Sequence, residues 1–178
     1  FELDDEKLFN ACDIIFENIY NKRMYITGGT GSAAVGEAFT LDYDLPNPFA
    51  YTESCAVISL ALFARRMQVM NPDHKYADTI EKIIYNGFLS GISLDGKSFF
   101  YENPLEIRRE LVSRNASVKN SPERYPITQR LEMFGCSCCP PNVTRFIASI
   151  AEYLYNYNDD TLFIHQYINS TTNFKMGS

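Results

Sequence analysis

Three of the chain's five cysteines, Cys136, Cys138 and Cys139, lie within four positions, and two prolines follow them directly. A disulfide between adjacent residues requires a strained ring, so a crosslink between Cys138 and Cys139 is disfavoured. Thiolates gathered this closely are typical ligands of a soft metal such as zinc, which takes four ligands, or three and an open position. The cluster offers at most three thiols, so a metal site would need a further ligand from elsewhere in the chain.

Glu53 and Cys55 are candidates for that ligand, because they stand two positions apart where a turn-rich segment leads into an apolar run. Residues i and i+2 of a regular helix point to opposite sides, so both can face one metal only where a helix is just beginning. Cys12 lies beside the apolar stripe of another predicted helix, where a small core residue is the favoured interpretation. Spacing alone leaves open both a metal site and a buried cluster of thiols without a metal.

Four predicted helices would position these residues. Apolar spacing and end signals predict helices over Asp4 to Lys22, Thr52 to Met70, Lys75 to Leu89, and from an N-cap at Asn142 to Leu154. The second of these has apolar residues on nearly every face, which predicts burial on several sides.

The remaining segments predict loops and short strands. The glycine-rich residues 26–36 predict a loop that carries Glu37. A strand-like run, Ser98 to Tyr101, precedes a polar stretch to about Arg130 that we interpret as a long loop. After a turn at Asp159 and Asp160, Thr161 to Ile168 is rich in β-branched and aromatic residues and predicts a strand.

Composition excludes several classes of protein. With 178 residues, 46% of them hydrophobic, the chain can bury a core. Lysine plus arginine number 16 against 22 acidic residues, a balance that disfavours nucleic acid as a partner. The longest apolar run, Cys55 to Ala64, is shorter than the roughly 20 residues needed to cross a bilayer, so we expect no membrane partner. The odd number of cysteines and the lack of a visible leader lead us to expect a reduced, cytoplasmic location.

Eight short runs occur in order between residues 25 and 142, and their combination is distinctive. They are YITGG (25–29), GEAFT (36–40), DYDLP (42–46), ESC (53–55), YNG (85–87), LDGKSFFY (94–101), NPLE (103–106) and FGCSCCPPN (134–142). Together they resemble the β-L-arabinofuranosidases of glycoside hydrolase family 127.

This resemblance implies a zinc-dependent retaining glycosidase that releases β-L-arabinofuranose. Four residues match the zinc ligands of that family: Glu53, Cys55, Cys138 and Cys139. By the same matching, Cys138 would also be the nucleophile at the anomeric carbon, and Glu37 would be the general acid/base. Glu81 and Tyr101 match positions that contact the sugar. Without the resemblance, Glu37 would be interpreted as a solvated loop carboxylate.

The resemblance also implies a mainly α fold and a longer parent protein. Family members consist of an (α/α)6 barrel followed by β-sandwich domains. Residues 1–158 would then be a partial barrel containing its later helices, and residues 159–178 would be the beginning of a β-sandwich domain. We expect an arabinofuranoside or a related oligosaccharide as substrate. As protein partner we expect the remainder of the same barrel, or a second copy in a homo-oligomer.

Two other functions compete with an enzyme. In a non-catalytic protein the same four ligands would form a closed structural zinc site with three cysteines and one glutamate, and Glu37 would be idle. Covalent labelling of Cys138 by an activated sugar separates this alternative from a glycosidase. A redox protein would form disulfides reversibly, for which adjacent cysteines next to prolines are geometrically poor.

Overall fold

The structure is a computed structural model, and it describes residues 5–107, 129–136 and 138–175. This part of the chain is helical with one small two-stranded sheet. Its elements are α1 (Glu6–Asn18), η1 (Ile19–Arg23), α2 (Ser54–Met70), α3 (His74–Lys82), η2 (Ile83–Phe88), η3 (Leu89–Gly91), α4 (Cys139–Ala148), η5 (Ile150–Tyr153), β1 (Tyr155–Tyr157) and β2 (Leu162–Ile164).

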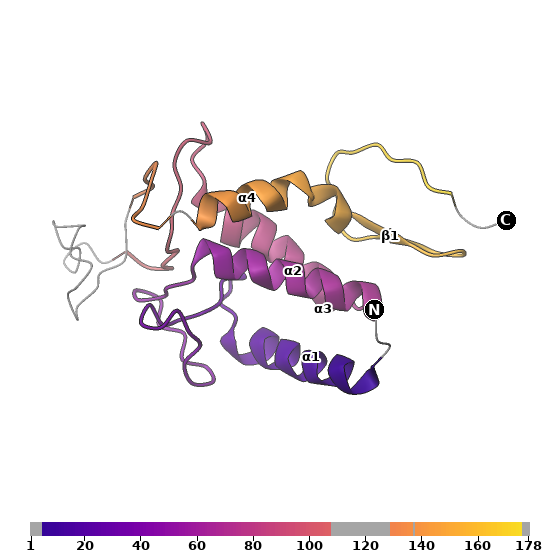
Figure 1. Cartoon of the computed structure of the whole chain (residues 1–178), viewed down its shortest axis with the longest axis horizontal. Helices are drawn as coiled ribbons and strands as arrows, with labels where there is room; N and C mark the ends of the chain where they lie inside the picture. The colour runs from indigo at the N-terminus through magenta and orange to yellow at the C-terminus, as the bar shows by residue number, and fades with distance from the viewer. Residues whose placement is uncertain (1–4, 108–128, 137, 176–178) are drawn as a thin grey trace.

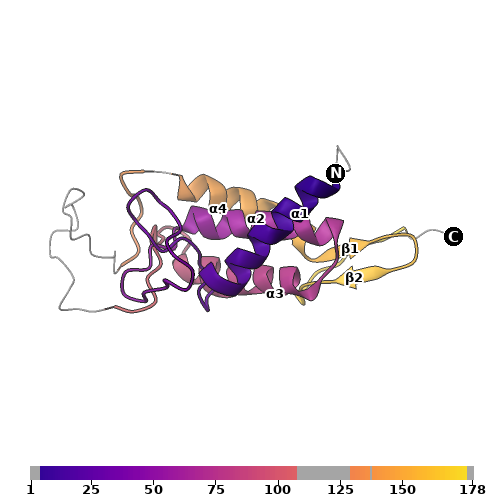
Figure 2. The same ribbon diagram turned by 90° about the horizontal axis from the view of Figure 1, so that it is seen from below.

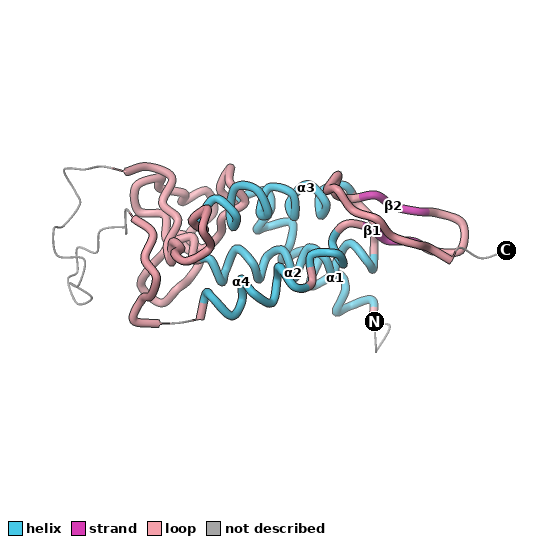
Figure 3. Tube along the Cα trace, turned by 90° about the horizontal axis from the view of Figure 1, so that it is seen from above, coloured by secondary structure: helices cyan, strands magenta, loops and turns pink. Residues whose placement is uncertain are grey.

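The helices form an elongated stack with different structures at its two ends. Figure 1 shows α2 between α4 and α1, with loops gathered at one end and the β1–β2 hairpin at the other. The same separation of loops, helices and strands is visible from above in Figure 3. Helices α2 and α4 both begin at the loop end, as the views of Figures 1 and 2 agree. Residues near the two helix starts are therefore brought to one place.

Three of the four predicted helices are confirmed, with ends that shift by a few residues. Asp5 caps α1 by accepting hydrogen bonds from the backbone N–H groups of Lys7 and Leu8, and Asp73 caps α3 by accepting one from the backbone N–H of Lys75. The first helix ends in the π-helical turn η1, and the third continues through the π-helical η2 into the 3-10 turn η3. The carboxylate caps explain why these two helices begin where they do.

The fourth helix begins earlier than the sequence predicted. Cys138 occupies the N-cap position of α4 and Cys139 is its first residue, so Asn142 lies inside the helix and does not cap it. Pro140 and Pro141 stand in the first turn, where a missing N–H costs no hydrogen bond. The α-helix also ends earlier, at Ala148, and continues only as the 3-10 turn η5.

The core surrounds α2, as its apolar residues on several faces predicted. Val57, Ile58, Ala61 and Met67 on this helix are fully buried. Aromatic rings extend the core to both sides in edge-on pairs: Phe16 with Tyr76 between α1 and α3, at 4.7 Å between ring centroids, and Phe88 with Phe146 between η2 and α4, at 5.2 Å.

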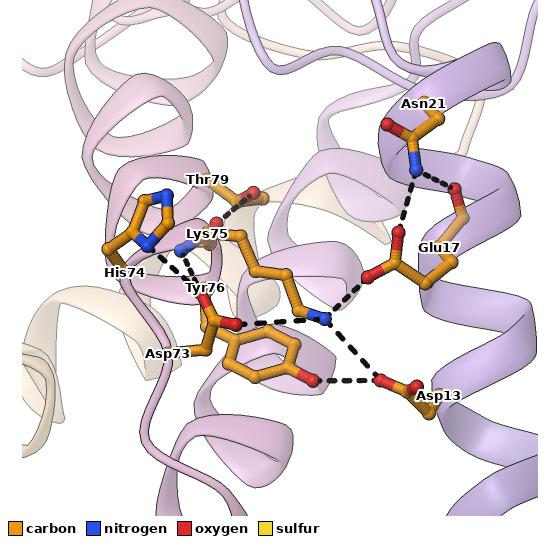
Figure 4. A network of polar contacts seen from close by, with 8 residues as sticks. All are labelled: Asp13, Glu17, Asn21, Asp73, His74, Lys75, Tyr76 and Thr79. Atoms are coloured by element: carbon orange, nitrogen blue, oxygen red, sulfur yellow. Dashed lines mark hydrogen bonds and ion pairs between the residues drawn. The ribbon is translucent and has the colours of Figure 1, made fainter.

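A polar network at the α1–α3 contact complements this packing (Figure 4). The Lys75 ammonium lies 3.6 Å from an oxygen of Asp13 and also pairs with Glu17, both on α1. The Tyr76 hydroxyl donates to Asp13 at 3.1 Å. These contacts join the second half of α1 to the start of α3.

The strand predictions are confirmed only in part. Phe99 forms isolated bridges with Ile92 and Leu131, so residues 98–101 pair locally without forming a strand. β2 covers Leu162–Ile164, part of the predicted run, and pairs antiparallel with β1, which the sequence analysis did not predict. The boundary proposed between residues 158 and 159 falls between these two strands and stays a prediction. Most of the predicted long loop, residues 108–128, lies outside the described residues.

None of the helices in the described part of the chain combines the length and apolar character needed to span a bilayer.

Candidate functional site

The starts of α2 and α4 supply the four predicted metal ligands. Glu53 is the N-cap residue of α2 and has non-helical backbone angles, φ −56° and ψ 138°, while Cys55 lies in the first helical turn. This change of backbone direction lets both side chains face one point, as the sequence required. Cys138 and Cys139 stand at the equivalent place on α4. Because both helices begin at the same end of the stack, all four side chains converge.

The four ligand atoms lie within 4.8 Å of one another. Sγ of Cys139 is 3.5 Å from Sγ of Cys55 and 3.8 Å from Sγ of Cys138. Glu53 Oε1 is 3.1 Å from Sγ of Cys138 and 3.8 Å from Sγ of Cys139. Four thiolates around a zinc ion at a distance of about 2.3 Å would lie about 3.8 Å apart. The donor set and its spacing therefore fit zinc. Cys136 is exposed and lies outside this group of four.

Burial disfavours the charged thiolate forms of the three cysteines. It raises the pKa of Cys138 to about 12, and it raises the pKa values of Cys55 and Cys139 above their ordinary range as well. Glu53, only 6% exposed, adds a carboxylate to the same space. A divalent cation would offset the cost of holding thiolates and a carboxylate together, which is a second reason why these residues fit a metal.

Asn142 supports one of the candidate ligands, a role that the sequence analysis missed. Its side-chain N–H donates to Sγ of Cys55 at 3.1 Å, and its carbonyl oxygen accepts from Arg145 at 2.7 Å. The missed signal was the pair of prolines, whose preference for a first turn would have started the helix at Cys139 and placed Asn142 on the inner face of that turn.

Tyr101 contacts the predicted nucleophile. The Cys138 thiol donates to the Tyr101 hydroxyl at 3.3 Å, and an ionised Cys138 could accept a hydrogen bond from the same group. Tyr101 was expected to contact a sugar, and that role stays a prediction. The ring of Phe134, just before the cysteine cluster, packs against Tyr101 at 5.6 Å between centroids.

Glu37 lies on an exposed turn and accepts a hydrogen bond from a buried tyrosine. The turn is closed by paired backbone hydrogen bonds between Ala33 and Ala38, and Glu37 has a φ of 48°, in the left-handed region that few side chains adopt. The hydroxyl of Tyr51 donates to Glu37 Oε1 at 2.7 Å. The ring centroids of Tyr51 and Tyr101 lie 6.3 Å apart. Tyr51 is therefore a neighbour of the tyrosine that contacts Cys138.

Glu81, the other predicted sugar-contacting residue, lies in a different setting. It lines an open cavity of about 270 Å³ on α3 and η2, together with Asp78, Lys82, Tyr85 and Asn86. Within the described residues, no hydrogen bond joins Glu81 to the four ligands or to Tyr101. Its proposed contact with substrate stays a prediction.

Together these features define a helical domain whose two helix starts bring together three cysteines and one glutamate that could hold a metal ion. The chain belongs to the family of β-L-arabinofuranosidase catalytic domains of glycoside hydrolase family 127, whose model matches residues 1–152.

Relatives of known identity agree with this assignment. The chain is 41% identical over 177 residues to the non-reducing end β-L-arabinofuranosidase of Bifidobacterium longum subsp. longum, which covers 98% of this chain but 26% of that protein. The crystal structure of a family 127 β-L-arabinofuranosidase from Geobacillus stearothermophilus T6 superposes with a TM-score of 0.84 at 47% identity, over 94% of this chain and 25% of that one. A second family 127 β-arabinofuranosidase gives a TM-score of 0.77 at 41% identity, over 92% and 23% of the two chains. The chain thus spans about a quarter of the length of these relatives.

Proposed function

We propose that the protein is a retaining glycoside hydrolase that releases β-L-arabinofuranose from arabinofuranosides, and that this chain carries its nucleophile, its acid/base and its metal ligands. The observation that carries the proposal is the convergence of Glu53, Cys55, Cys138 and Cys139 in a chain that belongs to family 127. Glu37, whose carboxylate accepts a hydrogen bond from Tyr51, would supply the second group that glycoside cleavage requires.

Zn²⁺ is the proposed cofactor, held by the four ligand atoms. When bound, it would supply positive charge that keeps the buried Cys138 thiol ionised near neutral pH and makes this thiolate a better leaving group. A thiol whose pKa is raised by burial to about 12 would otherwise be a poor nucleophile at that pH.

The chain's own residues then account for two displacement steps. In the first, Sγ of Cys138 forms a bond to the anomeric carbon while the bond from that carbon to the leaving oxygen breaks. Glu37 donates its proton to that oxygen as it departs. In the second, Glu37 takes a proton from water, whose oxygen bonds to the anomeric carbon as the carbon–sulfur bond breaks. Two inversions at this carbon give net retention of configuration.

The parent protein completes the pocket in this proposal. Residues 1–158 would be the later part of an (α/α)6 barrel and residues 159–178 the beginning of a β-sandwich domain, in a cytoplasmic enzyme. The chain spans 26% of its curated relative, so further sugar contacts would come from the remainder of the barrel. Tyr101, beside Cys138, would contact the sugar from within this chain, and Glu81 would do so from α3.

One observation favours a second candidate function, a closed structural zinc site. Four protein ligands would complete a tetrahedral coordination shell without leaving the open position that most catalytic zinc sites keep. In that case Cys138 would never leave the metal to react with a sugar, and Glu37 would have no proton to transfer.

Covalent labelling separates the two functions. The full-length protein is incubated with an aryl β-L-arabinofuranoside, quenched in acid and digested, and the peptide containing Cys136 to Cys139 is weighed by mass spectrometry. A glycosidase gives one added pentosyl unit on this peptide, which persists in the Cys136→Ser variant and disappears in Cys138→Ser. Zinc-loaded, folded protein that neither turns over the substrate nor carries the adduct would favour the structural site.

A further inference from the structure

Tyr51 is a buried residue whose hydroxyl engages the proposed acid/base. Its side chain is 3% exposed, and the hydroxyl donates to Glu37 Oε1 at 2.7 Å, the short distance typical of a bond to a charged acceptor. Sequence matching gave Tyr51 no role, and the mechanism above requires none beyond its contact with Glu37.

The surroundings of Tyr51 hold it in one place. Its backbone N–H donates to the carbonyl of Ser32 at 3.3 Å, and its own carbonyl accepts from the N–H of Asn103 at 3.2 Å. Its ring belongs to a buried cluster with Phe99, Tyr101 and Cys139. The two backbone hydrogen bonds fix the main chain at Tyr51, and packing within the cluster restrains the two side-chain torsions of its ring.

Glu37, in contrast, is exposed on the turn of residues 34–37, and a glutamate in such a place ordinarily samples several rotamers. Its φ of 48° is a sparsely populated conformation that persists where neighbouring contacts hold it. The hydrogen bond from Tyr51 therefore links a mobile type of side chain to a rigid part of the core. General acid catalysis depends on such placement, because the proton must meet the leaving oxygen at hydrogen-bond distance.

We propose that Tyr51 is a positioning residue that fixes the carboxyl group of Glu37 for proton transfer. The hydroxyl engages Oε1 and leaves Oε2 to carry the proton that Glu37 gives to the leaving oxygen and later takes from water. This inference rests on the proposed function, since it assigns Tyr51 a role only through Glu37.

The test compares Tyr51→Phe with a matched control in the full-length, zinc-loaded enzyme. Tyr76→Phe is the control, because Tyr76 is also buried and also donates to a carboxylate, that of Asp13, but at the α1–α3 contact. Each variant is assayed on an alkyl arabinofuranoside, whose leaving group needs protonation, and in rapid-quench glycosylation by a dinitrophenyl arabinofuranoside, whose leaving group does not. Zinc content and the midpoint of thermal unfolding are recorded for every variant.

We expect Tyr51→Phe to lower kcat/KM on the alkyl substrate about 10- to 100-fold, the usual worth of a hydrogen bond to a charged group. For the same variant, the glycosylation rate with the dinitrophenyl substrate and the zinc content should stay within about twofold of wild type. The control variant Tyr76→Phe should change neither the alkyl rate nor the glycosylation rate. In a Glu37→Gln background, Tyr51→Phe should cause no further loss on the alkyl substrate, because two residues that act through one group are not additive.

Three outcomes would overturn the positioning role while leaving the proposed function in place: an unchanged alkyl rate, an equal loss on both substrates, or a full additional loss in the Glu37→Gln background. An equal loss accompanied by lost zinc or a lower unfolding midpoint would assign Tyr51 to the scaffold. Absence of arabinofuranosidase activity in the wild-type enzyme would instead contradict the proposed function itself.

Discussion

Glu53 Oε1 and Cys138 Sγ lie 3.1 Å apart, although 85 positions separate the two residues in the chain. A carboxylate and a thiolate at this distance repel each other unless one is protonated or a cation lies between them. Burial first, and this carboxylate among other neighbours, raises the pKa of Cys138 to about 12. Without a metal the thiols would therefore be protonated, and they would release these protons when a metal binds.

The first prediction concerns the metal itself. Purified full-length protein should contain one zinc ion per chain. Cys139→Ser removes a ligand and should weaken zinc binding by more than about 100-fold, which exceeds the 10- to 100-fold loss typical of removing a residue that only hydrogen-bonds to a ligand. Elemental analysis after dialysis against a chelator of known affinity measures both. Cys136→Ser is the matched control, since Cys136 is exposed and outside the ligand group. Well-folded, reduced protein without zinc would contradict the assignment.

The second prediction concerns pH. The pKa values of Cys55, Cys138 and Cys139 are all raised by burial, so the metal-free thiols are protonated near neutral pH and must release protons when they bind zinc. Zinc affinity should therefore rise steeply with pH, by as much as about 1,000-fold per unit if three protons are released. Competition titrations at several values between pH 6 and pH 8 would measure the slope. A flat profile would mean that the thiols are already ionised without metal.

The third prediction concerns Glu37. Glu37→Gln should leave zinc content and fold unchanged, because Glu37 is not a ligand, but it should lower turnover of an alkyl-linked substrate by about 10²- to 10⁴-fold. An aryl arabinofuranoside should still glycosylate Cys138, and the adduct should accumulate because the carboxylate that activates water is gone. Mass spectrometry during turnover follows the adduct. Full activity of this variant on the alkyl substrate would rule out the assigned role.

The fourth prediction concerns Asn142. Its N–H donates to Sγ of Cys55, so Asn142→Ala should weaken zinc binding by about 10-fold, the lower part of the range for a partner that orients a ligand. Thr144→Val is the control on the same helix, because the Thr144 hydroxyl bonds to the backbone of Pro140 and not to the ligand group. Chelator competition on both variants gives the comparison. Equal affinities would show that the Asn142 contact is incidental.

The fifth prediction concerns the isolated chain. On α1 the side chains of Leu8, Ile14 and Ile15 are 55%, 70% and 54% exposed, an apolar face that the remainder of a barrel would cover. The 178-residue chain alone should therefore associate, and a double Ile14→Lys, Ile15→Lys variant should associate less. Asn10→Lys, which adds charge at an exposed polar position of the same helix, is the control. Light scattering that finds a monomer, with cooperative unfolding, would count against this expectation.

Local sequence patterns determined where the helices lie and which residues could bind a metal. Carboxylate caps such as Asp5 and Asp73 and the period of the apolar residues are local signals, so three helices could be predicted to within a few residues of their ends. The same local reasoning required Glu53 and Cys55 to stand at a helix start, which is where they lie. Local reasoning placed the start of α4 too late because two local signals compete there. Asn142 is a good capping residue, whereas the two prolines prefer the first turn of a helix and favour the earlier start that the structure has.

Tertiary structure decided which of these residues meet. Nothing local to residues 53–55 or 138–139 specifies that the two segments come together; this depends on α2 and α4 packing side by side and beginning at the same end of the stack. That packing includes Cys139 in the ligand group and leaves Cys136 outside it, although both belong to one short run. The contact between Tyr51 and Glu37 has the same origin, because a hydrogen bond between residues 14 positions apart in irregular segments follows no sequence period.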